Sequence, residues 1–171
     1  MRTSAVSIGA VIAVAAVGCA QEEPDKTTAV PPAASKSAAA PAAQTEEAVK
    51  RAVKEFTSAY ASGDYAGAWE WWDSAAKKVL PQAEYEKVFE LCPSPAQGVP
   101  FTVEAARLSA ARDSAVVRVS RATFQFSYRV VYEGGQWRFK PDAQSLAEYR
   151  LGSAEKIAAK RRAAGKCDKT G

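Results

Sequence analysis

The spacing of apolar side chains changes once along this chain, near residue 100. Between Thr45 and Cys92 they recur every three or four residues, which is the spacing of one face of an α-helix. Between Phe101 and Lys140 they alternate with polar residues, which is the spacing of a β-strand with one buried face. Helices followed by strands in this order predict an α+β domain.

Three helices are predicted before the change of spacing. The first runs from an N-cap at Thr45 to a stop at Gly63, because a hydroxyl satisfies the first amide groups and glycine adopts the left-handed conformation that ends a helix. Asp64 then caps a second helix, which is rich in tryptophan. A third short helix follows Pro81.

Four strands are predicted next, at residues 101–109, 114–121, 124–133 and 136–140. Gly134 and Gly135 are typical of a two-residue hairpin turn, which places Tyr132 opposite Trp137. In this register one face of the last two strands is apolar and consists of Phe124, Phe126, Tyr128, Val130, Tyr132, Trp137 and Phe139. A sheet divided in this way has one face covered by the core and the other exposed to solvent.

The chain becomes helical again after Pro141, near residues 143–150 and then from Ser153 to about Ala164. We therefore expect an α+β fold, with N-terminal helices on one face of a curved antiparallel sheet of about four strands and a C-terminal helix. The domain is expected to span residues 45–167, followed by a tail at 168–171.

The N-terminus has the features of an export signal. Arg2 precedes an apolar run from Ala5 to Val17, which is shorter than the roughly 20 residues that a membrane-spanning helix needs. The segment Ala-Val-Gly-Cys that ends at Cys19 resembles the lipobox of bacterial lipoproteins, in which the cysteine is diacylated and becomes the new N-terminus. This resemblance implies a signal peptide at 1–18 and a lipid anchor on the extracytoplasmic face of the cell membrane. An ordinary cleaved signal, with Cys19 incidental, is the alternative.

Residues 20–44 are mostly alanine, proline, threonine, serine, glutamine and glutamate, with one aspartate and two lysines, and have no large apolar side chain apart from Val30. Such a segment cannot bury enough apolar surface to fold, so we expect residues 19–44 to be a disordered tether behind the lipid. All the aromatic side chains lie between Phe56 and Tyr149, which places the packed core there.

Composition also limits the chemistry. The chain has no histidine, which removes both the commonest general base and the commonest metal ligand, and we expect no metal and no cofactor. The net charge of +4 is spread along the chain, whereas nucleic-acid binding usually needs a concentrated basic face. We therefore expect no nucleic-acid partner.

Several short motifs carry a resemblance to a known superfamily. They are Ala-Ser-Gly-Asp-Tyr at the end of the first helix, the tryptophan-rich second helix, Tyr-x-x-Val-Phe in the third, and Gly-Gly-Gln-Trp-Arg-Phe in the last strand pair. Together, over residues 45–140, they resemble the nuclear transport factor 2-like superfamily of cone-shaped α+β domains. Members often bind a small ligand inside the cone, and some are enzymes. Similar domains occur in small secreted lipoproteins.

Of the three cysteines, Cys19 is assigned to the lipid, which leaves Cys92 and Cys167. Two thiols in an oxidising compartment usually pair, so we expect a disulfide between them. A reactive or metal-binding thiol is the alternative, although neither cysteine lies in a Cys-x-x-Cys motif.

The candidate ligand pocket consists of aromatic residues predicted on the covered face and on the second helix: Trp69, Trp72, Phe126, Tyr128, Tyr132 and Trp137. The aspartates Asp64, Asp73, Asp113 and Asp142 lie where helix caps or turns are expected, so they are assigned to structure. No carboxylate falls on an inward strand position, and we assign no catalytic residue.

We therefore expect a membrane-tethered domain that binds a small apolar ligand or a protein partner without catalysing a reaction. One alternative is a cone-fold enzyme, such as an isomerase or dehydratase, that uses Tyr128 or Tyr132 with an acid from elsewhere. Another is a structural module that forms a homodimer. The last helix is basic, which predicts either a solvated face or attraction to anionic lipid or wall polymer, through Lys156, Lys160, Arg161, Arg162 and Lys166.

Overall fold

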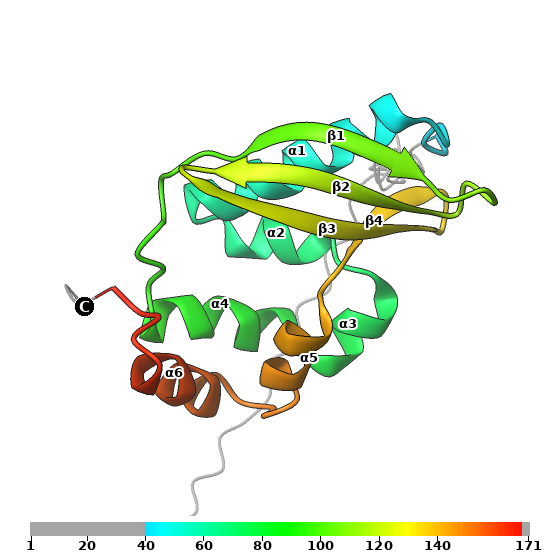
Figure 1. Ribbon diagram of the computed structural model, residues 1–171. Coiled ribbons are helices and arrows are strands. Elements are labelled where there is room, and N and C mark those ends of the chain that lie inside the picture. The colour runs from blue at the N-terminus through cyan, green and yellow to red at the C-terminus, as the bar shows by residue number, and fades with distance from the viewer. Residues whose placement is uncertain (1–39, 169–171) are drawn as a thin grey trace, which may run out of the picture. The chain divides into compact units, whose positions relative to one another are not determined.

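Figure 1 shows the computed structural model, in which residues 40–168 are described. The predicted signal peptide, Cys19 and most of the predicted tether lie outside these residues. In chain order the elements are α1 (Glu46–Ser62), α2 (Tyr65–Glu70), α3 (Ser74–Val79), α4 (Gln82–Leu91), β1 (Thr102–Leu108), β2 (Ser114–Arg121), β3 (Phe124–Glu133), β4 (Gln136–Lys140), α5 (Ala143–Tyr149) and α6 (Ala154–Ala163).

The helix ends follow the predicted capping residues. The Thr45 hydroxyl accepts a hydrogen bond from the amide of Ala48, and Gly63 ends α1 with a φ of 87°. Asp64 caps α2 by accepting from the amide of Gly67. These residues stop and restart the helix within two positions, so α1 and α2 can pack against each other.

The tryptophan-rich segment differs from the prediction of a single second helix. The α2 helix ends at Glu70, and a separate helix, α3, begins after its own N-cap, Asp73. Between them Trp72 forms a parallel bridge with Phe139 of β4, because the Phe139 amide donates to the Trp71 carbonyl and the Asp73 amide donates to the Phe139 carbonyl. This pairing with a distant strand interrupts the helix, so four helices rather than three precede the sheet within the described residues.

The sheet is antiparallel throughout, in the order β1-β2-β3-β4. The predicted hairpin is confirmed: Gly134 and Gly135 have φ values of 59° and 79°, Tyr132 pairs with Trp137, and Val130 pairs with Phe139. Positive φ at both turn positions is what the tight turn requires, and glycine adopts it without a steric penalty.

The helices are stacked on one side of the sheet (Figure 1). The α1 helix contacts β1, β2 and β4. The α2 helix lies against both α1 and α4, and α4 in turn packs on α6. The predicted fold class is therefore confirmed: helices contact one face of a four-stranded antiparallel sheet, and further helices follow it. The sheet side of the core contains Val49, Val53, Val117, Val119, Val130 and Trp137.

The covered face is less continuous than predicted. Val117, Val119, Val130 and Trp137 are almost completely buried, but Phe124 is 67% exposed and Phe126 is 40% exposed. Both rings belong to the same face as Tyr128, which pairs with Val117, so the alternation was predicted correctly. The helices nevertheless leave the start of β3 partly open to solvent.

The first described residues are attached to the sheet. The Ala42 amide donates to the Gly135 carbonyl, the Tyr132 hydroxyl donates to the Ala42 carbonyl at 2.7 Å, and the Trp137 indole N–H donates to the Ala43 carbonyl at 3.0 Å. Residues 40–44, the last of the predicted tether, are thus held on the β3–β4 hairpin.

The predicted disulfide between Cys92 and Cys167 is confirmed. It joins the end of α4 to the segment after α6, across a sequence separation of 75 residues. Beside it, the Asp168 amide donates to the Pro93 carbonyl. The C-terminal segment is therefore fixed against the α4 end.

Candidate functional site

The space between α1 and the sheet, where the resemblance implies a ligand, is filled with side chains. Phe56 of α1 stacks on Phe139 of β4 with ring centroids 4.2 Å apart. The small gap beside these rings has no room for a water molecule. This space therefore has no room for a ligand, and the other hollows of the described residues are the remaining candidates.

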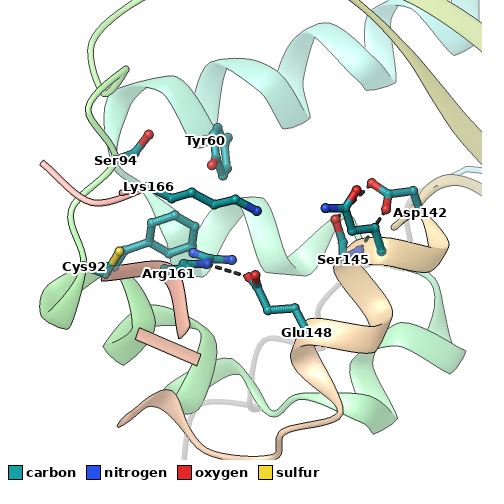
Figure 2. Close-up of a pocket in the computed structure, with 10 residues that line it drawn as sticks. Tyr60, Cys92, Ser94, Asp142, Ser145, Glu148, Arg161 and Lys166 are labelled. Atoms are coloured by element: carbon teal, nitrogen blue, oxygen red, sulfur yellow. Dashed lines mark hydrogen bonds and ion pairs between the residues drawn. The ribbon is translucent and has the colours of Figure 1, made fainter. Parts of the chain in front are cut away.

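A cavity of about 340 Å³ lies between the end of α1, α4, and the helices that follow the sheet (Figure 2). The residues that line it come from separate segments and are mostly polar: Tyr60, Phe89, Cys92, Ser94, Asp142, Gln144, Ser145, Glu148, Arg161 and Lys166. One other hollow, of 350 Å³, lies between α2 and α4, and another, of 340 Å³, lies between α1 and Phe101. Neither of these two hollows is lined by a buried charged side chain, whereas the first cavity is lined by the buried Glu148. We call the first one, beside Tyr60 and Arg161, the inter-helix cavity.

An ion pair forms one wall of the inter-helix cavity. Arg161 of α6 donates through Nε to the Glu148 carboxylate of α5 at 2.6 Å, and the two side chains are only 14% and 11% exposed. The guanidinium also lies 5.1 Å from the ring centroid of Phe89. Burial acts to lower the pKa of Arg161, but the neighbouring Tyr149 and Glu148 outweigh it and the pKa lies above its usual value. The wall therefore contains a permanent cation matched by one carboxylate.

Tyr60, near the end of α1, contributes a hydroxyl to the opposite wall. Its ring makes edge contacts with Phe89 and Phe101, and Figure 2 shows its hydroxyl pointing toward the side where Ser94 lies. Burial raises the pKa of Tyr60, although Arg161 and Arg121 partly oppose that rise. The hydroxyl is therefore a neutral hydrogen-bond donor at physiological pH.

Arg121 lies behind Tyr60, at the end of β2. Its guanidinium carbon is 5.7 Å from the Tyr60 ring centroid and 4.4 Å from that of Phe101. It donates hydrogen bonds to the carbonyls of Val99 and Ala96, which hold it in place. Val117 and Val119 precede it on the same face of the strand, so the alternation of β2 carried the signal that this arginine points inward.

Lys166 is placed by the disulfide. It directly precedes Cys167, whose partner Cys92 itself lines the inter-helix cavity. The Lys166 amide donates to the Arg161 carbonyl, and Figure 2 shows its side chain extending across the cavity below Tyr60. An exposed lysine is normally mobile, but here its backbone is fixed on both sides.

The far side of the inter-helix cavity is acidic and hydroxylated. Asp142 is the N-cap of α5 and accepts hydrogen bonds from the amide and the hydroxyl of Ser145, at 2.8 and 2.9 Å. Asp142 thus has a capping role, as predicted, and Glu148 is held by Arg161. The arrangement provides donors and charges for binding, and both carboxylates already serve the structure.

The six predicted pocket residues do not line the inter-helix cavity. Trp69 donates through its indole N–H to the Leu80 carbonyl, and Lys77 lies over its ring at 4.3 Å. Trp72 is 2% exposed and packs against Tyr85 and Tyr149. Trp69 and Trp72 are therefore part of the packing.

The four predicted pocket residues on the strands lie in two groups. Tyr132 and Trp137 contact each other, with ring centroids 5.2 Å apart, and hold residues 42 and 43 as described above. Phe126 and Tyr128 stack along β3 at 6.4 Å. Burial raises the pKa of Tyr128, and Asp142 contributes to the increase.

The sequence did not point to the residues that form the inter-helix cavity. Arg161 was grouped with the basic, solvated residues of the last helix, yet it is mostly buried. The available signal was its spacing from the buried Ile157 and Ala158, which places it on the same side of α6. Glu148 directly precedes the buried Tyr149 on α5, and this position gave no comparable signal because neighbouring residues of a helix do not share a face.

Comparisons with known proteins name no relative. No protein-family model, curated protein or solved structure matches the chain. Within residues 40–168, no helix is both long enough and apolar enough to cross a membrane. In the same part of the chain, histidine, cysteine, aspartate and glutamate side chains nowhere gather in a group of three that could hold a metal ion.

Proposed function

We propose that this domain binds a small molecule in the inter-helix cavity, without catalysing a reaction, while a lipid on Cys19 holds it at the extracytoplasmic face of the membrane. The observation that supports binding is the cavity itself, whose volume of about 340 Å³ lies within the usual range for small-molecule sites. Its polar groups come from α1, α5, α6 and two loops, and they converge on one space.

The site is organised before any ligand arrives. The Arg161–Glu148 ion pair joins α6 to α5, and the Cys92–Cys167 disulfide joins the C-terminal segment to α4. Groups that are already held in place lose little conformational freedom on binding, so more of their interaction energy contributes to affinity. Such preorganisation is typical of a binding site.

The structural roles of the two lining carboxylates favour binding over catalysis. A general base is positioned by its surroundings to take a substrate proton, whereas each of these carboxylates is positioned as the partner of another group in the fold. Glu148 accepts from Arg161, and Asp142 accepts from the α5 amide and from Ser145. The Tyr132 hydroxyl, one candidate for the enzyme alternative, donates to the Ala42 carbonyl rather than to a carboxylate.

The lining also bears on the kind of ligand. Only Tyr60 and Phe89 offer aromatic surface, and the other groups are charged, hydroxylated or amide-bearing, apart from the disulfide sulfur. We therefore propose a ligand with polar groups and a small apolar part, in place of the wholly apolar ligand that the sequence suggested.

A fragment screen on the full-length, disulfide-bonded protein tests this function. Binding is followed by amide chemical shifts, and Gln144→Trp places a large ring at the cavity rim, since Gln144 is exposed and lines the cavity. Ala147→Trp is the matched control, because Ala147 is exposed on the same helix outside the lining. Fragments that shift Tyr60 and are lost only in Gln144→Trp support the proposal, and fragments unaffected by Gln144→Trp contradict it.

We also propose that the protein is a lipid-anchored membrane protein and that its domain belongs to the nuclear transport factor 2-like superfamily. The lipobox-like segment at Cys19 supports a bacterial lipoprotein, and the order of elements supports a nuclear transport factor 2-like domain. Mass spectrometry of the mature protein tests the anchor. A diacylated Cys19 at the N-terminus is expected, and any other N-terminus contradicts it.

The exposed rings of Phe124 and Phe126 favour a second candidate function, the docking of another protein. They lie on an apolar face that the helices leave open, and exposed aromatic rings are enriched at protein interfaces. Another copy of this chain is the first partner to test, by light scattering of the full-length protein. The double variant F124S/F126S is expected to abolish association, while Val116→Ser, an exposed control on the opposite face, leaves it unchanged.

A further inference from the structure

Cationic groups gather at one end of the inter-helix cavity. Arg161 and Lys166 line that end, and Arg121 lies behind the Tyr60 ring. Glu148 is the carboxylate beside them, and it is bound to Arg161. Asp142 lies across the cavity, next to Ser145 (Figure 2). Once the ion pair is discounted, the end near Tyr60 has an excess of positive charge.

We propose that this end binds the carboxylate of a small aromatic acid, an inference that rests on the proposed binding function. The Lys166 ammonium and the Tyr60 hydroxyl donate to the carboxylate, while Arg161 remains paired with Glu148 in the wall. The ring of the acid lies against Tyr60 and Phe89, the aromatic side chains of the lining.

The donors fit a carboxylate better than a neutral group. Hydrogen bonds between charged partners are shorter and roughly twice as strong as those between neutral ones. The ammonium of Lys166 offers three such donors, and none of the other residues lining the cavity forms an ion pair with it (Figure 2). Tyr60 stays protonated because burial raises its pKa, so its hydroxyl remains a donor.

The geometry also argues for a single negative charge. Glu148 already neutralises Arg161, so Lys166 is the cation of the lining that remains for a ligand. Asp142 at the far side repels a second carboxylate and accepts hydrogen bonds instead. A monocarboxylate with a neutral polar substituent at its opposite end matches both sides of the cavity.

Three probes of nearly the same shape separate these charges: benzoate, benzamide and benzamidine. Each is titrated into the full-length, disulfide-bonded protein, and the amide shifts of Tyr60, Phe89 and Ser145 report binding. Benzoate is expected to bind most tightly and benzamidine least tightly. The preference for benzoate over benzamide is expected to shrink as salt concentration rises, because partly exposed ion pairs are screened.

The variant Lys166→Gln removes the proposed charge and is expected to weaken benzoate binding about fivefold, the upper range for an exposed ion pair, without changing benzamide binding. Lys160→Gln is the control, because Lys160 is exposed on α6 but does not line the cavity. Unchanged amide spectra of the free variants show that both remain folded.

Benzamide binding as tight as benzoate binding, or equal effects of Lys166→Gln and Lys160→Gln, would overturn the inference. If none of the three probes binds while other fragments still fill the cavity and are blocked by Gln144→Trp, the carboxylate inference fails and the proposed function stands. If no fragment binds at all, both fail.

Discussion

Breaking the ion pair between Arg161 and Glu148 is expected to destabilise the domain strongly. The variant Glu148→Leu leaves a guanidinium that is 14% exposed without its partner, and Arg161→Met leaves a carboxylate that is 11% exposed. Two unit charges about 4 Å apart attract by about 4 kcal/mol at an effective dielectric constant of about 20. Losing one partner of a buried pair typically costs about 3–5 kcal/mol, because the remaining charge stays buried without compensation.

The double variant Glu148→Leu with Arg161→Met is expected to recover most of that loss. It removes both desolvation penalties together, and the unbranched methionine chain can keep part of the contact that Arg161 makes with Phe89 and Tyr149. The double variant should therefore lie within about 2 kcal/mol of the unchanged protein, with a coupling free energy of several kcal/mol between the two positions.

Urea unfolding of the full-length, disulfide-bonded protein, followed by tryptophan fluorescence, measures these free energies by linear extrapolation. The total stability of a domain of this size is about 5–15 kcal/mol, so each single variant should show a large shift of the unfolding midpoint. Single variants that each cost less than about 1 kcal/mol, or costs that simply add in the double variant, would refute a buried, coupled pair. The wall of the inter-helix cavity would then be solvated and adaptable.

Three further predictions concern the covalent link, the attached N-terminal residues and the buried tyrosines. Replacing Cys92 and Cys167 by serine is expected to lower the free energy of unfolding, measured with urea, by about 4 kcal/mol, as the chain-entropy model gives for a separation of 75 residues. The same change should remove the preference for benzoate, because it releases Lys166. An unchanged unfolding midpoint would contradict this prediction. Trp137→Phe removes the hydrogen bond to the Ala43 carbonyl and part of a buried ring, so its cost should be about 1 kcal/mol smaller in a protein truncated before residue 45, which has lost the acceptor and keeps only the packing loss. Burial raises the pKa of Tyr65 to about 12, while the unfolded state loses its proton near 10.0, so the contribution of this tyrosine to stability should be fully present below pH 10 and be lost as the pH rises between these values. Burial raises the pKa of Tyr60, Tyr85, Tyr128 and Tyr149 in the same direction, so in the variant Tyr132→Phe, which keeps only the five shifted tyrosines, tyrosinate absorbance should increase together with unfolding, and its increase in the folded variant would contradict the reasoning.

Local patterns predicted the features of the fold that depend on neighbouring residues. Helix α1 begins and ends at Thr45 and Gly63 because a cap requires only its own hydrogen bonds and backbone angles. The β3–β4 register followed from Gly134 and Gly135 for the same reason, since two left-handed residues admit one tight turn. The disulfide was predicted by counting, because two cysteines remained to pair.

The departures occur where segments far apart in the chain meet. The tryptophan-rich helix is broken at Trp72 because the backbone there pairs with Phe139, a partner that no local pattern contains. Residues 40–44 resemble a free tether in composition, yet Tyr132 and Trp137 bind their carbonyls. Phe124 and Phe126 alternate like core residues, although the helices leave them exposed.

The amino-acid sequence by itself determined the α+β class, the four strands and which face of the sheet is apolar, because capping and alternation act over a few residues, and counting the cysteines paired Cys92 with Cys167. Only the tertiary structure decided that Phe56 fills the space beneath the sheet and that a cavity opens beside Tyr60 instead. Arg161 becomes a buried cation only because α6 places it beside Glu148 of α5. The sequence of a basic helix is the same whether its charges face solvent or a carboxylate of another helix, so the local pattern cannot distinguish the two cases.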